Sequence, residues 1–311
     1  MAPESQLLDP RTLVRIRDLA LRSRAVIDGM CRGVHHTPQP GLSVEFTEYR
    51  SYAMGDDLRF LDWKRYARSD RLYVRRFEDE TNLRCWFLFD VSRSMAFGEQ
   101  SVSKIEYGAT LIATLSYVLI NRRDAVGLAR FAERIESFHP ARLHFQHWRR
   151  LLGALSGSSS ATTTDLGRSV EQIGGLLKGR GLVIVVSDFL AELESMRLPL
   201  ARLRARGHDV LLLQLLDPAE VHFVDDGRHW IRDLETGRRI TVDPNRTSAE
   251  YHERFARHQE TLRELARATE CDVETILTST PLDQALSDLL ERRARLTKGR
   301  VLRRSQGGSV R

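Results

Sequence analysis

The sequence predicts a doubly wound α/β fold, in which a mostly parallel β-sheet is covered by helices on both faces. Strand-like and helix-like segments alternate from about Leu83 onward, the pattern of a sheet built from crossover units. Residues 181–188, GLVIVVSD, form a short β-branched run bounded by Gly and Asp, as in a strand buried on both faces. Residues 104–121 are apolar almost all round, which indicates a buried helix. Together these features predict a sheet that is covered by helices on both faces.

The elements in the first part of the alternation follow from their apolar patterns. Residues 83–90, LRCWFLFD, read as a buried strand that ends in aspartate. The helix at 104–121 comes next, and residues 125–132 and 135–139 then predict a pair of strands. Residues 145–155, FQHWRRLLGAL, have the apolar spacing of an amphipathic helix.

The second part begins with a loop that is rich in Ser and Thr, residues 156–165. A Thr or Asp at its end caps the helix expected at 165–178. The central strand at 181–188 is followed by further alternation. The remaining expected elements are a helix at 192–207, a strand at 209–217, a helix at 249–268, a strand at 271–278 and a helix at 282–295.

Three divisions of the chain are predicted around this sheet. Residues 1–80 form an N-terminal module of different character, and residues 81–295 form the α/β domain. Within that domain, residues 219–242 alternate apolar and polar side chains around Asp-Gly and Thr-Gly turns, which predicts an inserted β-hairpin or meander. Residues 296–311 are polar, basic and aperiodic, so we expect a disordered basic tail.

Composition bounds the class of protein. The chain has 311 residues, of which 41% are hydrophobic, enough for one large core and a smaller attached unit. No apolar run approaches the roughly 20 residues that cross a bilayer, and the N-terminus lacks the apolar stretch of a secretory signal. The three cysteines are widely spaced, which argues against a disulfide framework or a zinc cluster. A cytoplasmic protein without a membrane span is therefore expected.

The positive charge is concentrated at the C-terminal end of the chain. The formal net charge is +6, but residues 292–311 hold eight Lys and Arg and no acid, which leaves 40 basic against 42 acidic residues in the rest. Residues 56–80 interleave aromatic and basic side chains, and seven basic residues there are offset by seven acidic ones. A segment without net charge binds phosphates poorly. We therefore expect no specific nucleic-acid contact, and an adaptor that binds nucleic acid through the tail is a weaker alternative.

Oxygen-bearing side chains follow the two central strands of the predicted sheet. The first strand closes with Asp90, and Ser92 and Ser94 follow at alternate positions. The strand at 181–188 closes with Asp188, and the Thr-rich loop before the helix at 165–178 offers Thr164. Ligands of open parallel sheets bind at the carboxyl ends of strands, where the strand order reverses. An all-oxygen set of low charge suits Mg²⁺ or another divalent cation better than zinc. The alternative is that these residues cap helices or form turns.

This pattern resembles the metal-ion-dependent adhesion site of von Willebrand factor type A domains. The resemblance lies in D-x-S-x-S after a strand, a Thr before a helix and an Asp after a β-branched strand. It implies that Ser92, Ser94 and Thr164 contact the cation and that Asp90 and Asp188 act largely through water. Thr164 is preferred over Thr162 and Thr163 because TDLG resembles the Thr-Asn/Asp-Leu-Gly step of that family.

The segment upstream of the sheet resembles a second family. Residues 45–80 contain Glu-Phe, Tyr-Arg, Gly-Asp-Asp, Asp-Trp, Ala-Arg, Leu-Tyr-Val and Phe-Glu elements, and DPAE at 217–220 and DLETG at 233–237 also fit. They resemble the bacterial family called domain of unknown function 58, over roughly residues 10–295. The resemblance implies a partner, a MoxR-type AAA+ ATPase, and a role as an adaptor in the assembly or maturation of client proteins.

We therefore expect a protein-interaction module and no catalytic residues. An acidic side chain of a partner would complete the coordination of the cation. The competing class is a Mg²⁺-dependent phosphoester hydrolase with Asp90 or Asp188 as nucleophile or base, although the motif offers hydroxyls where such an enzyme would use more carboxylates and a lysine. No phosphate-binding glycine motif or nucleophile elbow occurs. His144 and His147 read as residues of a surface helix and not as a metal pair.

Overall fold

The computed structural model describes residues 18–33, 49–51, 73–75, 83–98, 102–157, 165–221, 230–232, 239–241 and 244–289. Two compact units divide the chain: Val34–Asn82 forms one, and Met1–Gly33 together with Leu83–Arg311 forms the other. Within the smaller unit, β1 (Tyr49–Ser51) pairs antiparallel with β2 (Tyr73–Arg75). The predicted module at 1–80 is otherwise mostly outside the described residues, as is the basic tail at 296–311.

A six-stranded sheet organises the larger unit. The strand order is β10-β7-β6-β3-β4-β5, and every neighbouring pair is parallel except β4 and β5. The strands are β3 (Arg84–Asp90), β4 (Ala125–Phe131), β5 (Ile135–Arg142), β6 (Leu182–Ser187), β7 (Asp209–Leu216) and β10 (Asp272–Leu277). This order confirms the predicted doubly wound α/β class. The chain builds outward from β3 to β5 and then returns to β6 on the other side of β3, so the strand order reverses between β3 and β6.

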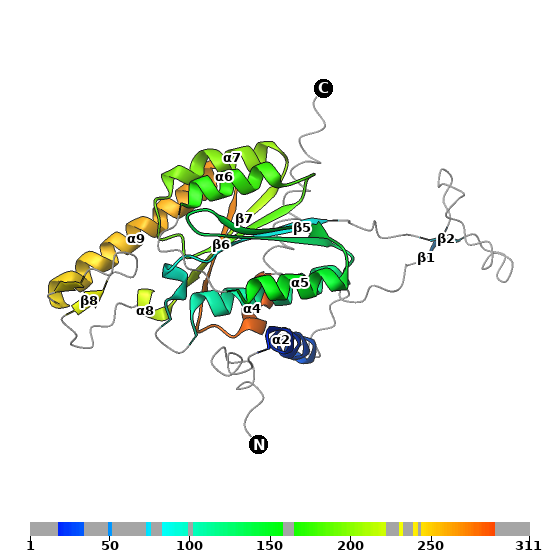
Figure 1. The fold of residues 1–311 in the computed structure, drawn as a ribbon, viewed down its shortest axis with the longest axis horizontal. Helices are drawn as coiled ribbons and strands as arrows, with labels where there is room; N and C mark the ends of the chain where they lie inside the picture. Colours follow the sequence, from blue (N-terminus) through cyan, green and yellow to red (C-terminus); the bar gives the residue numbers. More distant parts are fainter. Residues whose placement is uncertain are drawn as a thin grey trace, which may run out of the picture. The chain divides into compact units, whose positions relative to one another are not determined.

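Helices cover both faces of the sheet (Figure 1). Residues of one face share a core with α2 (Leu19–Gly33), α4 (Lys104–Asn121), α5 (Phe145–Leu155) and the helical residues 282–289. Residues of the opposite face share a core with α6 (Leu166–Leu176), α7 (Arg197–Ala205) and α9 (Pro244–Ala268). Two short 3₁₀ turns, η4 (Ser94–Ala96) and η5 (Glu194–Met196), precede α4 and α7.

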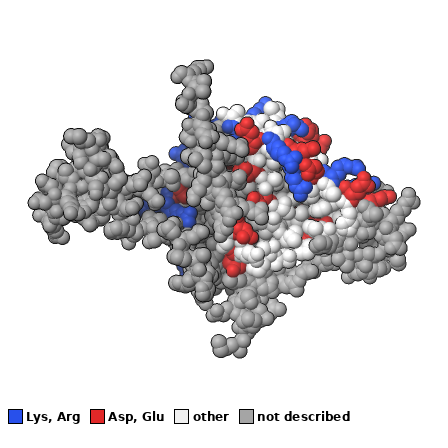
Figure 2. All heavy atoms as spheres, turned by 180° about the vertical axis from the view of Figure 1, so that it is seen from behind, with Lys and Arg blue, Asp and Glu red and all other residues white. Residues whose placement is uncertain are grey.

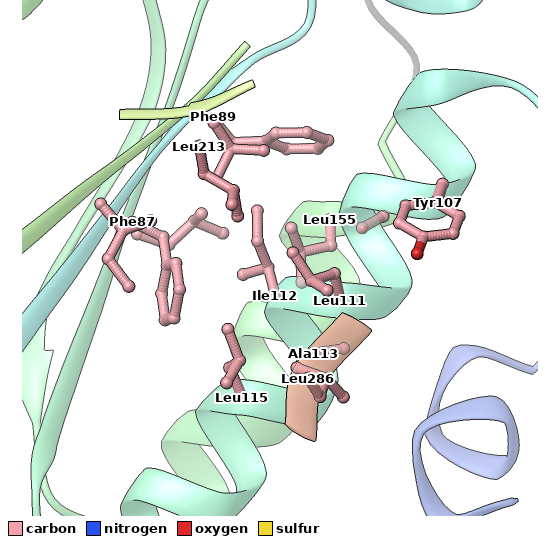
Figure 3. Packing of buried hydrophobic residues seen from close by; sticks show 14 of the residues in the cluster. Phe87, Phe89, Tyr107, Leu111, Ile112, Ala113, Leu115, Leu155, Leu213 and Leu286 are labelled. Atoms are coloured by element: carbon pink, nitrogen blue, oxygen red, sulfur yellow. The ribbon is translucent and has the colours of Figure 1, made fainter. Parts of the chain in front are cut away.

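The alternation of side chains along the strands explains the two cores. In β3, Phe87 and Phe89 point to one face, whereas Trp86 and Leu88 point to the other. Figure 3 shows the two phenylalanines on the sheet side of α4, which presents apolar side chains that include Ile112. Burying each side chain of this size contributes roughly 1.5–3 kcal/mol. This packing fixes α4 so that its first turn lies at the carboxyl end of β3.

Helix α2 belongs with the sheet, which differs from the predicted grouping of residues 1–80. Leu19 and Val26, seven residues apart, are buried in the same core as α4. The Arg22 Nη1 donates to Thr110 Oγ1 at 3.4 Å. Residues 18–33 thus complete the cover of α4, and the apolar face of this helix is the physical reason for the difference.

The predicted insertion contains a hairpin, with β8 (Trp230–Arg232) antiparallel to β9 (Arg239–Thr241). It is preceded by a single helical turn, α8 (Pro218–Val221), where the sequence predicted extended chain from residue 219. Helix α9 begins at Pro244, five residues before the predicted start. Among the helices in the described ranges, none is long and apolar enough to cross a membrane.

Candidate metal centre

Asp90 ends β3 in a buried turn at the point where the strand order reverses. Asp90 is only 1% exposed to solvent. The Ser92 backbone N–H donates to Asp90 Oδ1 at 2.9 Å, and the Ser187 hydroxyl donates to Asp90 Oδ2 at 2.7 Å. The first bond closes a local Asx turn, so the predicted alternative of a turn-forming aspartate is realised in part. The second bond ties β3 to β6 across the reversal.

The two serines of the motif face one another. The Ser92 and Ser94 hydroxyls form a hydrogen bond with each other, with 3.1 Å between their Oγ atoms. Ser92 is buried and Ser94 is half-buried, whereas Arg93 between them is exposed, so the alternation expected from the sequence holds. Met95 is buried, and its N–H donates to the Ser92 carbonyl at 3.1 Å, which anchors the turn to the core.

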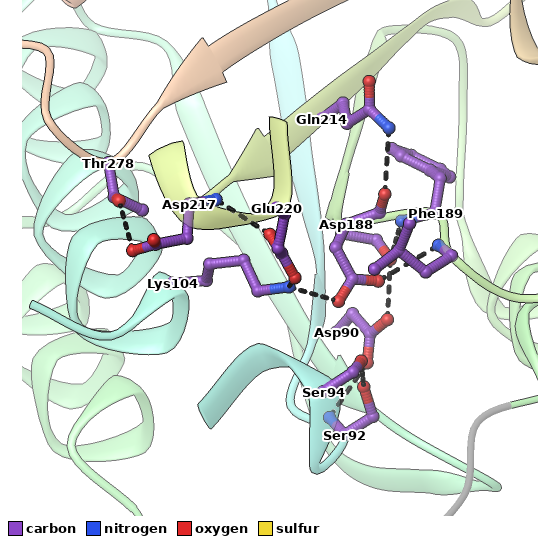
Figure 4. A network of polar contacts seen from close by, with 12 residues as sticks. Asp90, Ser92, Ser94, Lys104, Asp188, Phe189, Gln214, Asp217, Glu220 and Thr278 are labelled. Atoms are coloured by element: carbon purple, nitrogen blue, oxygen red, sulfur yellow. Dashed lines mark hydrogen bonds and ion pairs between the residues drawn. The ribbon is translucent and has the colours of Figure 1, made fainter. Parts of the chain in front are cut away.

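Asp188 follows β6 and lies beside the Asp90 turn. The parallel register pairs Phe89 with Val186, which places Asp90 next to Ser187 and Asp188 just beyond it. Asp188 is 2% exposed, and its Oδ1 accepts from the Leu190 N–H at 3.2 Å. Asp90 and Asp188, from neighbouring strands, therefore lie side by side at the carboxyl edge of the sheet (Figure 4). We call this edge, formed by Asp90, Ser92, Ser94 and Asp188, the rim.

The backbone after Asp188 adopts an unusual conformation. Phe189 has φ of 54°, in the left-handed region that a bulky residue rarely occupies. Three interactions hold it there: its N–H donates to Ser187 Oγ at 3.0 Å, its carbonyl accepts from His258 Nε2 at 2.7 Å, and its ring is fully buried. Strained residues of this kind cluster at functional sites. Here the conformation turns the chain sharply enough to keep Asp188 at the rim.

A buried lysine joins the rim to α8, a feature that the sequence analysis missed. Lys104, the first residue of α4, is 0% exposed, and its Nζ donates to Asp188 Oδ2 at 2.8 Å and to Glu220 Oε1 at 2.5 Å. The Asp217 N–H donates to Glu220 Oε2 at 2.8 Å, and the Thr278 hydroxyl donates to Asp217 Oδ2 at 3.1 Å. These contacts link three strand ends to α4 in one network (Figure 4).

The sequence did carry a signal for this network. Lys104 opens a helix that is otherwise apolar almost all round, and lysine is almost never fully buried unless it is paired. Glu220 lies in the DPAE segment that fits the family pattern. The pairing of the two could not be read from spacing, because 116 residues separate them.

Burial and neighbouring charges shift the pKa values of three groups in this region, Asp90, Lys104 and Glu220. Burial, with Asp188 nearby as a second cause, raises the pKa of Asp90 to about 7 in spite of the hydrogen bonds from Ser187 and Ser92. Burial by itself would lower the pKa of Lys104, but Asp188 and Glu220 outweigh it, so its pKa lies above the ordinary value. Burial also raises the pKa of Glu220. Together, Asp90, Asp188 and Glu220 supply three carboxyl groups beside the single ammonium of Lys104.

The donor chemistry of this rim fits a hard divalent cation. Two neighbouring ligands of an octahedral Mg²⁺, each about 2.1 Å from the ion, stand about 3 Å apart, close to the separation of the two serine hydroxyls. No group of three or more His, Cys, Asp and Glu side chains arranged to hold a metal occurs within the described part of the chain. A cation here would therefore depend on hydroxyls as well as on Asp90 and Asp188. Thr164, the fifth predicted ligand, lies outside the described residues, as do its neighbours Thr162 and Thr163.

Comparisons with known proteins identify the family of the chain and two relatives. Residues 48–261 match the model of a family described as protein of unknown function DUF58. The chain belongs to the DUF58 family. An uncharacterized protein of Mycobacterium tuberculosis, Rv1480, is 30% identical over 241 residues, which cover 76% of this chain and 75% of that protein. An uncharacterized protein of Mycobacterium avium, MAV169, is 36% identical over 81 residues, 25% of this chain and 47% of that protein.

Two solved structures of low sequence identity resemble about two thirds of this chain. The conserved hypothetical protein BatB of Bacteroides thetaiotaomicron is 18% identical, with a TM-score of 0.47 over 68% of this chain and 99% of that chain. The SpRpn10 VWA domain is 10% identical, with a TM-score of 0.39 over 66% of this chain and 94% of that chain. The strand order described above, with β5 as an antiparallel edge strand, is that of the doubly wound α/β class that the sequence predicted.

The structure also bears on the predicted surface position of His147 and on the distribution of surface charge. His147 is buried, and its Nε2 lies 2.9 Å from the Val126 carbonyl, so it is a core residue and the surface interpretation was wrong for it. On the face seen in Figure 2, Lys and Arg lie interleaved with Asp and Glu over the described residues. Along α9, Arg263 pairs with Glu260 at 3.1 Å. A mixed surface of this kind is a poor trap for phosphates.

Proposed function

We propose that this DUF58 protein is a protein-interaction module whose binding depends on a divalent cation such as Mg²⁺. One observation carries the proposal: the Ser92 and Ser94 hydroxyls lie 3.1 Å apart beside two buried aspartates, at the reversal of strand order. The residues that would hold the ion are Ser92, Ser94 and Thr164 directly and Asp90 and Asp188 through water. When bound, the cation supplies a Lewis-acidic position that a carboxylate can fill.

The chain's own residues prepare the rim for such a partner. The Asx turn at Asp90 holds the Ser92 N–H inward, which leaves both serine hydroxyls on the same side as the carboxylates. Ser94 is half-buried and so provides access from solvent. The positive charge of the bound cation would favour a partner that offers an acidic side chain. In this proposal the partner is a MoxR-type AAA+ ATPase or a client protein, the assignment that the family resemblance implies.

The proposal includes no catalytic residue. A phosphoester hydrolase would use a lysine beside its carboxylates, and Lys104 does lie beside Asp188. However, Lys104 is 0% exposed and its ammonium already donates to two carboxylates. Its position therefore favours a charge-balancing role over contact with a substrate.

A binding experiment tests the proposal. A purified MoxR-type AAA+ ATPase from the same organism would be titrated against the full chain with Mg²⁺ or with EDTA, and the affinity measured by biolayer interferometry. We expect the affinity to fall at least tenfold with EDTA and equally in Ser92→Ala, because both remove the coordinating position. Ser156→Ala, an exposed serine on α5's C-terminal end, is the matched control and should bind as the wild type does.

Binding that is unchanged by EDTA and by Ser92→Ala would contradict the proposal. Mg²⁺-dependent turnover of p-nitrophenyl phosphate that is lost in Asp90→Ala would support the hydrolase instead. Loss of binding on deletion of residues 296–311 alone, with Ser92→Ala unaffected, would support an adaptor that acts through the tail.

A further inference from the structure

The buried ammonium of Lys104 lies close to the position where a cation beside Asp188 would bind. Its ammonium lies 2.8 Å from Asp188 Oδ2, and its side chain is fully shielded from solvent. Charges that lie close together in a buried site interact much more strongly than exposed ones, because water does not screen them. A divalent cation held beside Asp188 would therefore experience repulsion from Lys104 that no exposed lysine could exert.

The position of Asp188 does not depend on Lys104 alone. The Leu190 N–H holds its Oδ1, and the Gln214 Nε2 donates to its backbone carbonyl at 3.0 Å. Thr275 in turn donates to Gln214 Oε1 at 3.0 Å, so this support belongs to the sheet. Removing the ammonium would thus leave the Asp188 carboxylate in place with one oxygen released.

Glu220 gives Lys104 a second partner. The Glu220 carboxylate is fixed by the Asp217 N–H, and Ala219 N–H donates to Asp217 Oδ1 at 2.9 Å, so α8 presents it in a defined position. The ammonium is therefore shared between one carboxylate of the rim and one that lies outside the predicted ligand set. Without the Glu220 carboxylate, the Lys104 ammonium would pair with Asp188 alone.

We propose that Lys104 sets the affinity of the rim for a divalent cation, as a built-in competitor for the Asp188 carboxylate. The proposal rests on the metal centre of the proposed function and goes beyond it by assigning a residue that lowers metal affinity. The consequence is a site that binds its cation weakly enough to exchange it. Glu220 moderates the competition by holding part of the lysine's charge away from the rim.

Mn²⁺ titrations of the full chain by isothermal titration calorimetry test this assignment. Lys104→Met keeps the volume of the side chain and removes its charge, so the dissociation constant should fall at least tenfold. Lys178→Met makes the same change at an exposed lysine near the amino end of β6, and should leave the constant within twofold of the wild type. Glu220→Gln should raise the constant about threefold or more, because Lys104 then pairs with Asp188 alone.

The double variant separates competition from a general loss of charge. In the Lys104→Met background, Glu220→Gln should change the constant less than it does in the wild type, because the two residues act on the cation through one another. Equal effects of Glu220→Gln in both backgrounds would overturn the proposal. If Lys104→Met does not fold, the effect of Glu220→Gln decides, and an unchanged or lower constant would overturn it.

The outcomes also separate this proposal from the metal centre itself. Wild-type binding that Ser92→Ala abolishes, with Lys104→Met no tighter than the wild type, overturns the role of Lys104 and leaves the metal centre standing. Absence of Mn²⁺ binding in the wild type and in Lys104→Met overturns both. Binding that emerges in Lys104→Met alone supports the competition in its strongest form.

Discussion

The two aspartates that end neighbouring strands differ in what surrounds them. Asp90, at the end of β3, is held by neutral donors, the Ser92 N–H and the Ser187 hydroxyl. Asp188, at the end of β6, is held by a backbone N–H and by the charged Lys104. Two aspartates at the carboxyl ends of neighbouring strands, one residue apart in register, thus differ in the charge of their partners. The difference shows that topology brings the carboxylates together, whereas a residue from a distant helix decides which of them is neutralised.

The largest expected effect comes from removing the carboxylate that is paired. Asp188→Asn, in EDTA at pH 8, should lower the free energy of unfolding by about 3 kcal/mol, because a buried ammonium loses one of its two counter-charges. Asp90→Asn is the matched change on the neighbouring strand, and should change the free energy by less than about 1 kcal/mol because the donors that contact Asp90 among the described residues, the Ser92 N–H and the Ser187 hydroxyl, are neutral. Urea unfolding followed by circular dichroism measures both. Equal losses in the two variants would remove the comparison.

A smaller effect is expected from pH. The pKa of Asp90 is raised to about 7 in the folded protein, above the value of an unfolded aspartate, so the folded state holds a proton that the unfolded state releases. The stabilisation from this proton is complete below about pH 4 and is lost as the pH rises through about 7. Between pH 5.5 and 8, without metal, the wild type should lose about 2 kcal/mol relative to Asp90→Asn.

The same urea experiment, repeated at four pH values in EDTA, checks this expectation. Lys104 has a raised pKa and stays charged throughout this range, so its pairing with Asp188 adds no slope near neutrality. A difference between wild type and Asp90→Asn that is flat from pH 5.5 to 8 would show that the Asp90 carboxylate ionises normally in the folded protein.

The sequence predicted the fold well because local apolar patterns identify most of its helices and strands. The β-branched run of β6 and the apolar helix α4 were placed within a residue of their observed bounds. The strand-end aspartates could be placed at one edge because parallel strands align their carboxyl ends. Helix α2 was assigned to the wrong side of a boundary since its partner, α4, lies about 90 residues away in the chain.

The electrostatic character of the site could not be predicted. The pairing of Lys104 with Glu220 depends on how α4 and α8 meet, and no local pattern encodes that contact. The left-handed Phe189 depends on a long-range hydrogen bond from His258 and on burial of its ring, beside a local bond to Ser187, and not on its own preference. Donor types were therefore readable from the motif, whereas the charge balance that governs a cation required the three-dimensional arrangement.

A crystal structure of the protein grown with Mn²⁺, with anomalous diffraction data collected at the manganese edge, would show whether the ends of β3 and β6 bind a divalent cation. We predict one anomalous peak about 2.1–2.3 Å from both Ser92 Oγ and Ser94 Oγ, with Asp90 and Asp188 facing it. Crystals of Ser92→Ala grown under the same conditions should lack this peak. A wild-type map without a peak at the ends of β3 and β6, in crystals that hold Mn²⁺ elsewhere, would contradict the account.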